Sequence, residues 1–474
     1  MEHKLPLGQA TNAPTVGEAR VRGGSRDRSY GLRTGQKTVS ARGLGALSAV
    51  FLAMASLTVP GGPAMAQKAP VEVVFWHQET PPNRVQRYQE IIDKFNAANP
   101  NIRVRQEVQD WATIYTVAPA AIGSGTGPDI LMVMPELGTY VRATSAVQPV
   151  TQFVKELDAT HHFLPAATDP YHDKGEFWGV PLWGMVQLLW YRKDIFQTAG
   201  IKAPPATWEE VQDVAAKLTK DKRFGITLPA SKTTATDQTF FSFLKTHKGE
   251  DLFDEKGKII FDNPNSVRAV DTYTKLLKYA APDSTNYAWG EPEAAFNNGS
   301  AAMLIDKGIM LSIFLKDSGA PAEALGCAPI PQPATNGQPG SHYASNAAMI
   351  LTKDRAKQEA AKQFIKYLLQ PDVYGPLLNA EPGLFLPVTG DGFTLKSWLS
   401  EPALNRWPEC TKLLAEQSKS GGLYGFTSGR YQINIGPIAG QNIIAQVIQK
   451  VAIDKMSPAE AVKWGQKAME AAIQ

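Results

Sequence analysis

Carboxylate, amide and aromatic side chains gather at the ends of predicted strands and in glycine-rich turns of this sequence. The candidates for a binding site are His77, Trp111, Glu136, Trp183, Met185, Asp306, Lys307, Tyr343, Asn346, Phe385, Tyr424 and Arg430. Carboxylates and amides hydrogen-bond to hydroxyl groups, and aromatic faces cover apolar C–H patches. Buried bonds from a carboxylate to a hydroxyl contribute roughly 1.5–3 kcal/mol each. The set therefore favours the binding of a small polyhydroxylated molecule.

Each candidate also has a structural alternative, because large side chains at the same positions are often core residues. We expect Trp190 and Tyr191, like Trp178, to be core residues, and Trp208 to pack a helix. Among the candidates, Glu136, Trp183 and Arg430 rank above the others as ligand contacts.

Sequence motifs of catalytic sites are missing from the chain. There is no GxSxG, no HExxH and no paired-acid motif. A glycosidase needs two carboxylates about 5–5.5 Å or 6.5–9.5 Å apart. GSGTGPD at Gly123–Asp129 lacks the order of a phosphate-binding loop and precedes its strand. We predict no catalytic residues, no cofactor and no metal site; an exported glycosidase and a scaffold or adhesin remain the competing hypotheses.

The length of 474 residues indicates two or three domains, and 43% hydrophobic with 20% charged residues is an ordinary soluble composition. The formal net charge of +3 is misleading. Residues 1–66 contain eight basic and three acidic residues, and removing that +5 leaves −2 for the rest. Because the positive excess lies in this leader, the basic pI does not indicate a nucleic-acid partner.

The leader itself has the pattern of an export signal. A basic region ends at Arg42, an apolar run covers Leu44–Val59, and Ala64-Met65-Ala66 supplies a small-x-small site. The run is shorter than the roughly 20 residues that span a bilayer. We therefore predict a cleavable signal peptide and N-terminal extension over residues 1–66, with cleavage after Ala66.

The two cysteines, Cys327 and Cys410, leave their pairing open. They could form a disulfide in an oxidising compartment, but two thiols define no framework. A two-cysteine metal site is disfavoured because no histidines have a matching spacing.

Hydrophobic periodicity predicts alternating strands and helices. The first segments are a strand at Val71–Trp76, a helix at Asn83–Asn96 and strands at Ile102–Val108 and Ile130–Met134. This β-α-β order predicts a parallel, doubly wound sheet with ligand at the carboxyl ends of the strands. Later segments are strands at Met185–Tyr191 and Phe224–Leu228, and helices at Asp237–His247, Val267–Tyr279 and Lys353–Leu369. Thr207 with Glu210 and Ser457 with Glu460 have the spacing of capping boxes.

Four segments together resemble one family. They are GVPLWGMVQLLWYRKDIFQTAGIKAPPATWEE at Gly179–Glu210, GPDI at Gly127–Ile130, PEAAFNNGSAAMLI at Pro292–Ile305 and GLFLPV at Gly383–Val388. The sequence resembles the extracellular solute-binding protein family 1, the sugar and glycerol-3-phosphate binding proteins of ABC importers, over nearly all of residues 70–474.

This resemblance implies an α/β fold: a two-lobed periplasmic binding protein of type II. Each lobe would be a doubly wound, mostly parallel sheet, with three hinge crossings near Phe177–Leu182, Ala344–Thr352 and Asp391–Ser397. Lobe 1 would comprise residues 67–182 plus 347–392, and lobe 2 residues 183–346 plus 393–474.

The resemblance also implies the function. We expect a periplasmic, monomeric binding protein that captures a mono- or disaccharide, or a sugar-like polyol, and delivers it to ABC permease subunits, with no nucleic-acid partner. Val133 and Ile309 stand roughly where maltodextrin binders place aromatic platforms, and Met185 replaces their acidic residue. These differences disfavour long glucans.

An alternative ligand class is sn-glycerol-3-phosphate or a glycerophosphodiester. The segments Phe75–His77, Phe95–Pro100 and Glu136–Thr139 resemble that branch of the family. Its binders use an arginine in a late glycine-rich loop, which FTSGR at Phe426–Arg430 resembles with a shift of one residue. Arg430 with Lys307 or His77 could then neutralise a phosphate.

Overall fold

The computed structural model describes residues 69–111, 113–427 and 430–474. The predicted signal peptide, residues 1–66, lies outside them. Within these three ranges, none of the helices combines the length and the apolar character needed to cross a membrane.

A mixed sheet runs through both lobes, in the order β2-β1-β3-β9-β6-β7, with β8 also paired to β6. The strands are β1 (Val71–His77), β2 (Ile102–Val108), β3 (Ile130–Val133), β6 (Val180–Arg192), β7 (Met303–Lys307), β8 (Leu325–Ala328) and β9 (Tyr343–Ile350). β1 is parallel to β2 and β3, whereas β9 pairs antiparallel with β3 and β6, and β6 with β7 and β8. Among these named strands, the predicted parallel pairing is therefore limited to β2-β1-β3.

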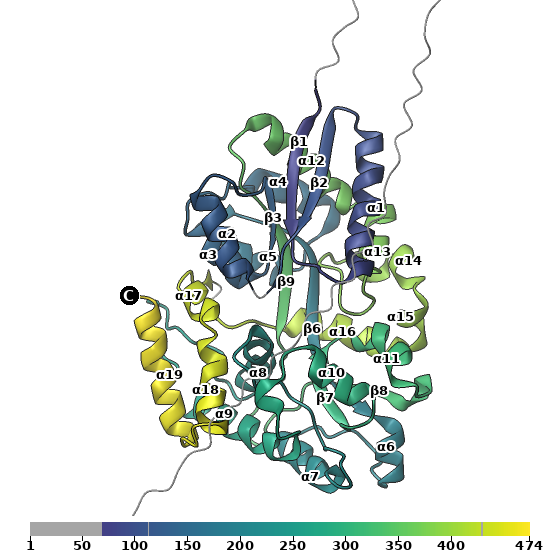
Figure 1. Cartoon of the computed structure of the whole chain (residues 1–474), viewed down its shortest axis with the longest axis vertical. Coiled ribbons are helices and arrows are strands. Elements are labelled where there is room, and N and C mark those ends of the chain that lie inside the picture. Colours follow the sequence, from purple (N-terminus) through teal and green to yellow (C-terminus); the bar gives the residue numbers. More distant parts are fainter. Residues whose placement is uncertain (1–68, 112, 428–429) are drawn as a thin grey trace, which may run out of the picture. The chain divides into compact units, whose positions relative to one another are not determined.

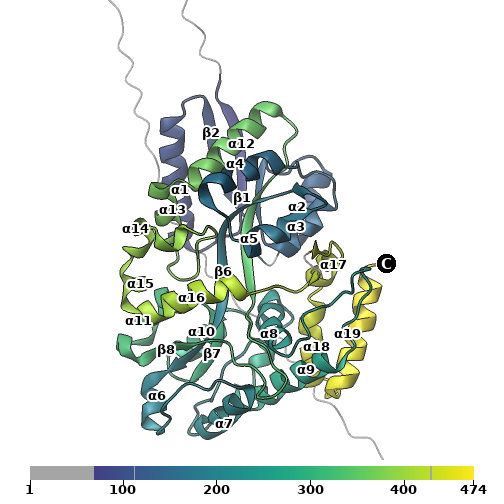
Figure 2. The same cartoon turned by 180° about the vertical axis from the view of Figure 1, so that it is seen from behind.

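Helices cover the two ends of this sheet (Figures 1 and 2). Around β1–β3 in the first lobe lie α1 (Pro82–Ala98), α2 (Ile114–Gly123), α3 (Pro135–Arg142), α4 (Thr151–His161), α5 (Pro165–Thr168), η1 (Asp169–Tyr171), the hairpin of β4 (His172–Asp173) and β5 (Glu176–Phe177), α12 (Arg355–Leu368) and α13 (Pro371–Leu378). Around β7 and β8 in the second lobe lie α6 (Lys193–Thr198), α7 (Trp208–Leu218), α8 (Thr234–Thr246), α9 (Pro264–Leu276), η2 (Leu277–Tyr279), η3 (Ser284–Asn286), α10 (Gly290–Asn297), α11 (Met310–Ser318), η4 (Ala322–Ala324), α17 (Ile435–Gly440), α18 (Ile443–Ala452) and α19 (Pro458–Ala472). The hairpin of β10 (Phe426–Thr427) and β11 (Arg430–Tyr431), which precedes α17 in the chain, contacts η1 and β4 of the first lobe through β11. The remaining elements are η5 (Gly392–Thr394), α14 (Lys396–Leu399), α15 (Pro402–Arg406) and α16 (Pro408–Ser420).

The long strand β6 joins what the sequence predicts as two segments, the first crossing and the strand that follows it. All of its residues except Tyr191 are buried, as expected for a nearly continuous apolar run. The second crossing is β9, which is buried along its whole length. By contrast, the strand predicted at Phe224–Leu228 is reduced to two isolated parallel bridges, from Phe224 to Ala301 and from Thr227 to Leu304 of β7.

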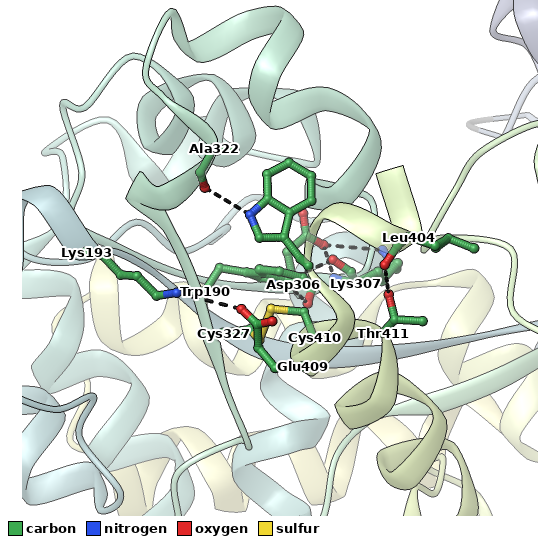
Figure 3. Close-up of a disulfide and its surroundings, with 11 residues drawn as sticks. Trp190, Lys193, Asp306, Lys307, Ala322, Cys327, Leu404, Glu409, Cys410 and Thr411 are labelled. Atoms are coloured by element: carbon green, nitrogen blue, oxygen red, sulfur yellow. Dashed lines mark hydrogen bonds and ion pairs between the residues drawn. A yellow bond between two sulfur atoms is a disulfide. The ribbon is translucent and has the colours of Figure 1, made fainter. Parts of the chain in front are cut away.

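A third passage between the lobes is predicted near Asp391–Ser397. At residues 396–399 the chain still contacts the first lobe, because the Asn379 side chain donates a hydrogen bond to the Ser397 carbonyl (3.0 Å). Further along, Cys410 of α16 forms a disulfide with Cys327 of β8, which settles the pairing that the sequence left open (Figure 3). The third crossing near Asp391–Ser397 and the lobe boundaries stay predictions.

Both predicted capping boxes are confirmed. At the start of α7, the Thr207 hydroxyl accepts a hydrogen bond from the Glu210 amide (3.2 Å), and Glu210 accepts one from the Thr207 amide (3.2 Å). Ser457 and Glu460 make the same exchange at the start of α19. Each box satisfies helix-terminal N–H groups that would otherwise lack a partner.

Loss of the cap on α7 should be measurable. Thr207→Ala is expected to lower the free energy of unfolding by about 1 kcal/mol, because an N–H at the helix start loses its acceptor. Chemical denaturation followed by far-UV circular dichroism checks this value. Thr116→Ala, at an exposed position inside α2, is the control and should change stability by less than about 0.5 kcal/mol. Equal losses in the two variants would contradict the capping assignment.

Candidate functional site

Many of the buried polar side chains near the junction of the two lobes have an N or O atom with no hydrogen-bond partner among the described residues. They are Gln78, Glu136, Trp183, Gln187, Gln238, His342, Tyr343, Asn346, Tyr424 and Tyr431. They come from the first lobe, from the crossing strands β6 and β9, and from the second lobe. A buried polar group without a partner costs about 1–3 kcal/mol, so such a concentration is typical of a ligand site.

Glu136 is the charged member of this set. It follows β3 in the first turn of α3, is 0% exposed, and neither of its carboxylate oxygens has a hydrogen-bond partner among the described residues. Burial raises its pKa to about 7. Its own backbone amide and the nearby Tyr424 hydroxyl oppose that rise, but the hydroxyl lies outside hydrogen-bonding geometry. The carboxylate is therefore available to accept two hydrogen bonds.

The crossing strands supply an aromatic and amide surface. The Trp183 indole is stacked on Phe385, with ring centroids 4.0 Å apart. The Tyr88 hydroxyl lies near its Nε1–H but outside hydrogen-bonding geometry, so this donor has no partner in the described chain. Asn346 lies opposite Trp183 in the β6–β9 register, with both amide atoms unpartnered. On the other face of β6, the Tyr343 ring covers Gly184, where a Cβ would come 2.5 Å from the Tyr343 hydroxyl. Gly184 is thus required for the ring of Tyr343 to lie in this position.

The buried cations near this surface are already paired. The Arg84 guanidinium lies 2.8 Å from the Glu79 carboxylate and 2.9 Å from that of Glu381. Lys307 lies 4.0 Å from Asp306, with its ammonium group over the Trp289 ring. Burial lowers the pKa of Lys307 to about 8, against the opposing effect of Asp306.

The structure brings predicted residues together in two groups. Glu136 lies near Tyr424, and Trp183 lies with Asn346 and Phe385. Tyr343 is separate, because it covers Gly184 on the other face of β6. Met185 is also buried on β6, opposite Ala344. Whether these residues contact a ligand stays a prediction.

The other predicted residues have different surroundings. His77 uses both ring nitrogens within the first lobe: Nε2 bonds the Gln106 side chain (2.7 Å) and Nδ1 accepts from the Glu79 amide (3.2 Å). Trp111 is half-buried against hydrophobic side chains of the first lobe. Asp306 and Lys307 pair with each other. Arg430 is 61% exposed and lies 3.5 Å from Asp173.

Sequence reasoning missed five members of the set: Gln78, Gln187, Gln238, His342 and Tyr431. A signal existed for Gln187, because it is the polar residue inside the apolar run Met185–Tyr191. Ser242 donates to its side-chain oxygen (2.7 Å), while its nitrogen has no partner among the described residues. His342 is fully buried, which lowers its pKa to about 3 and keeps the imidazole neutral.

Cavities are also present outside this set. Two cavities, of about 620 and 460 Å³, lie in the second lobe and are lined mainly by charged and amide side chains around α9. Neither contains one of the unpartnered residues. Tyr431 instead lines a cavity of about 10 Å³ together with Tyr171, Trp178 and residues of α3. The candidate site is therefore identified by the buried polar groups without a hydrogen-bond partner, and not by these two cavities.

Comparison with known proteins adds independent information. The profile of the bacterial extracellular solute-binding proteins matches residues 81–374. The chain is 23% identical over 429 residues to the Escherichia coli (strain K12) protein named "Putative ABC transporter periplasmic-binding protein YcjN", covering 89% of this chain and 97% of that one. It is 24% identical over 310 residues to a mannitol-binding protein of Pseudomonas aeruginosa, covering 64% of this chain and 70% of the relative.

Among solved structures, an ABC transporter solute-binding protein from Thermotoga lettingae bound with alpha-D-tagatose has a TM-score of 0.72 and 21% identity. The match covers 85% of this chain and 100% of that structure. At this identity the likeness establishes the two-lobed fold.

Proposed function

The chain belongs to the bacterial extracellular solute-binding proteins, and from this premise we propose that it captures a mono- or disaccharide, or a sugar-like polyol, between its lobes and delivers it to an ABC permease. The observation that carries the proposal is the set of buried, unpartnered polar side chains at the lobe junction. The mannitol-binding and tagatose-bound relatives support the same ligand class. The proposal includes that the protein is exported to the periplasm, is a monomer, and acts without catalysis or a cofactor.

The hydrogen-bonding groups of the set match a polyol. Trp183 Nε1 and Gln187 Nε2 are donors, the Glu136 oxygens are acceptors, and the Asn346 amide offers one of each. A hydroxyl group both donates and accepts, so a molecule with several hydroxyls could satisfy all of them. The Trp183–Phe385 stack adds an apolar surface suited to the C–H patches of a sugar or polyol.

A phosphorylated ligand is less well supported. A phosphate needs cations, but Lys307 and Arg84 are already paired with carboxylates and Arg430 is exposed beside Asp173. Glu136, when ionised, would also repel a phosphate dianion. Glycerol phosphate therefore remains the second candidate, which a direct comparison must distinguish.

A glycosidase mechanism is also poorly supported. Asp237 is the second buried carboxylate that interacts electrostatically with Glu136. Its oxygens accept hydrogen bonds from the Ala445 amide (2.6 Å) and the Asn442 side chain (3.1 Å), so it has a structural role between α8 and α18. Glu136 thus lacks a free acidic partner in Asp237.

A ligand panel tests the proposal. The midpoint of thermal unfolding should rise when a hexose, a disaccharide or a hexitol is added, and should not change with sn-glycerol-3-phosphate. At a ligand concentration of 100 Kd, the stabilisation is about 2.7 kcal/mol, which corresponds to roughly 3 °C for a protein of this size. A shift with glycerol phosphate alone would replace the polyol by the second candidate. No shift with any compound of the panel would contradict the ligand class.

Trp183→Phe should weaken binding of the ligand found in this way by about tenfold, because it keeps a stacked ring but removes the Nε1–H donor. Isothermal titration measures the loss. The matched control is Trp208→Phe: Trp208 is also buried and stacked, on Phe243 at 3.9 Å, but its Nε1–H donates to Thr246 inside the second lobe. That variant should lose stability and keep its affinity. Equal affinity losses would argue against Trp183 as a ligand contact.

A further inference from the structure

Glu136 lies at a seam where the two lobes touch. Helix α3 of the first lobe packs against α17 of the second so closely that a Cβ at Gly436 would come 3.3 Å from the Tyr140 Cα. Figures 1 and 2 both show these helices side by side. Gln238 of α8 reaches Met134, just before α3, from the second lobe (3.4 Å). The side chain of Glu136 is therefore buried by groups from both lobes.

Within the described part of the chain, the groups that face Glu136 offer it no positive charge. Tyr115 and Tyr171 approach from the first lobe, and Tyr424, Tyr431 and Asp237 approach from the second. Four of these five are phenols and the fifth is another carboxylate. Six residues further along α3, the guanidinium of Arg142 is already ion-paired with Asp173 (2.7 Å).

We propose that Glu136 makes lobe closure conditional. The lobes close over its carboxylate only when a ligand hydroxyl donates a hydrogen bond to it or when a proton neutralises its charge. The hydroxyl half of this inference rests on the proposed function, whereas the proton half concerns the protein alone. Closing over the ionised carboxylate without either would bury an uncompensated charge, which is strongly unfavourable. Glu136 is thus a specificity-determining residue that selects against closure without the ligand.

The sign of the proton effect follows from burial. When the lobes separate, Glu136 meets water and its pKa returns toward the ordinary value of 4.5, whereas in the closed arrangement it is about 7. The protonated form therefore favours closure. The closing equilibrium should rise as pH falls from 8 toward 5 and level off below about 4.5. From these two pKa values the gain between pH 8 and pH 5 is roughly 70-fold.

Neighbouring groups do not produce the same response. Burial raises the pKa of the four tyrosines above 10, so they stay neutral throughout this range. Asp237 has a pKa of about 7, but its hydrogen-bond partners, Asn442 and Ala445, belong to its own lobe, so its burial persists when the lobes separate. Lys307, with a pKa lowered to about 8 by burial, would act in the opposite direction if closure buries it.

Small-angle scattering of the ligand-free protein tests the inference directly. The protein is unfolded and refolded to remove any co-purified ligand, and its radius of gyration is measured at pH 5, 6, 7 and 8. We expect the wild-type radius to decrease as pH falls, with a midpoint between 4.5 and 7. Glu136→Gln, which is neutral at every pH, should be compact and insensitive to pH. Asp237→Asn is the matched control and should keep the wild-type response.

Two results would overturn the inference: a wild-type radius that does not change between pH 5 and 8, or a Glu136→Gln variant that keeps the wild-type response. Circular dichroism establishes that each variant is folded, and the wild-type pH series stands alone if a variant does not fold. The scattering experiment needs no ligand. If no sugar of the panel binds, the proposed function is contradicted, but the pH dependence of closure is not. A radius of gyration that does not change with pH would contradict the role of Glu136 in closure, whichever sugars bind.

Discussion

Arg84→Met is expected to lower the free energy of unfolding by about 3–5 kcal/mol, because it leaves two buried carboxylates without their cation. Arg84 bridges Glu79, two residues after β1, and Glu381, which follows α13. All three side chains are at most 11% exposed. Ser312 of α11 in the second lobe also donates a hydrogen bond to Glu381. The substitution therefore disturbs a charge cluster that extends across the lobe junction.

The loss of folding stability caused by Arg84→Met should depend on pH. Burial already raises the pKa of Glu79 in the folded protein, and loss of the opposing Arg84 raises it further. A group with a raised folded pKa favours the folded state at low pH and loses that contribution as pH rises through the folded pKa. The variant should thus recover part of its stability between neutral pH and pH 5.

Urea denaturation at pH 7.5 and pH 5 measures both effects. The matched control is Arg87→Met on the same helix, since Arg87 forms an exposed ion pair with Glu90 at 3.3 Å. We expect that control to change stability by less than about 0.5 kcal/mol at either pH. Similar losses for Arg84 and Arg87 would show that the buried cluster does not stabilise the fold.

Removing the disulfide should have an effect of similar size. The bond joins residues 83 positions apart, so it restricts a long loop in the unfolded chain. The loop-entropy relation gives about 4–5 kcal/mol for this separation, an amount that strain and residual structure commonly reduce. For a protein of this length, that corresponds to a fall of about 5 °C in the midpoint of thermal unfolding.

The double variant Cys327→Ser, Cys410→Ser should therefore melt earlier than the wild type in calorimetry. Dithiothreitol should lower the wild-type midpoint to that of the variant and leave the variant itself unchanged. A variant that melts with the oxidised wild type would mean that the contacts of α16, such as Trp407 Nε1–H to the Ala322 carbonyl (2.9 Å), hold this region without the covalent bond.

Local patterns in the sequence predicted much of the fold. Ile102–Val108 was predicted with the bounds that β2 has, and both capping boxes were predicted from residues three positions apart. These features depend on neighbouring residues, so their signals are complete within a short window. The boundary between the first crossing and the next strand was not predictable in this way, because nothing in an apolar run distinguishes one long strand from two segments.

The candidate site was predicted less completely, because its geometry depends on distant segments. His77 is the last residue of β1, but Gln106, on the neighbouring strand β2, occupies its Nε2. The cluster of Arg84 and Glu381 joins residues almost 300 positions apart, and neither has a local signal. Tyr431 stands next to the predicted Arg430, yet it is Tyr431 that is buried and Arg430 that is exposed. Alternation along the strand decides which of two adjacent side chains points inward.

Strand β6 limits how this protein can be divided. Residues Val180–Val186 of β6 pair with β9, and residues Gln187–Arg192 pair with β7 and β8, so a single stretch of backbone belongs to both lobes. A gene fragment that encodes only one lobe would either lack this strand or carry it with half of its apolar surface uncovered. Separate expression of the lobes is therefore a poor strategy, and reporter domains are better inserted in surface turns than between the lobes.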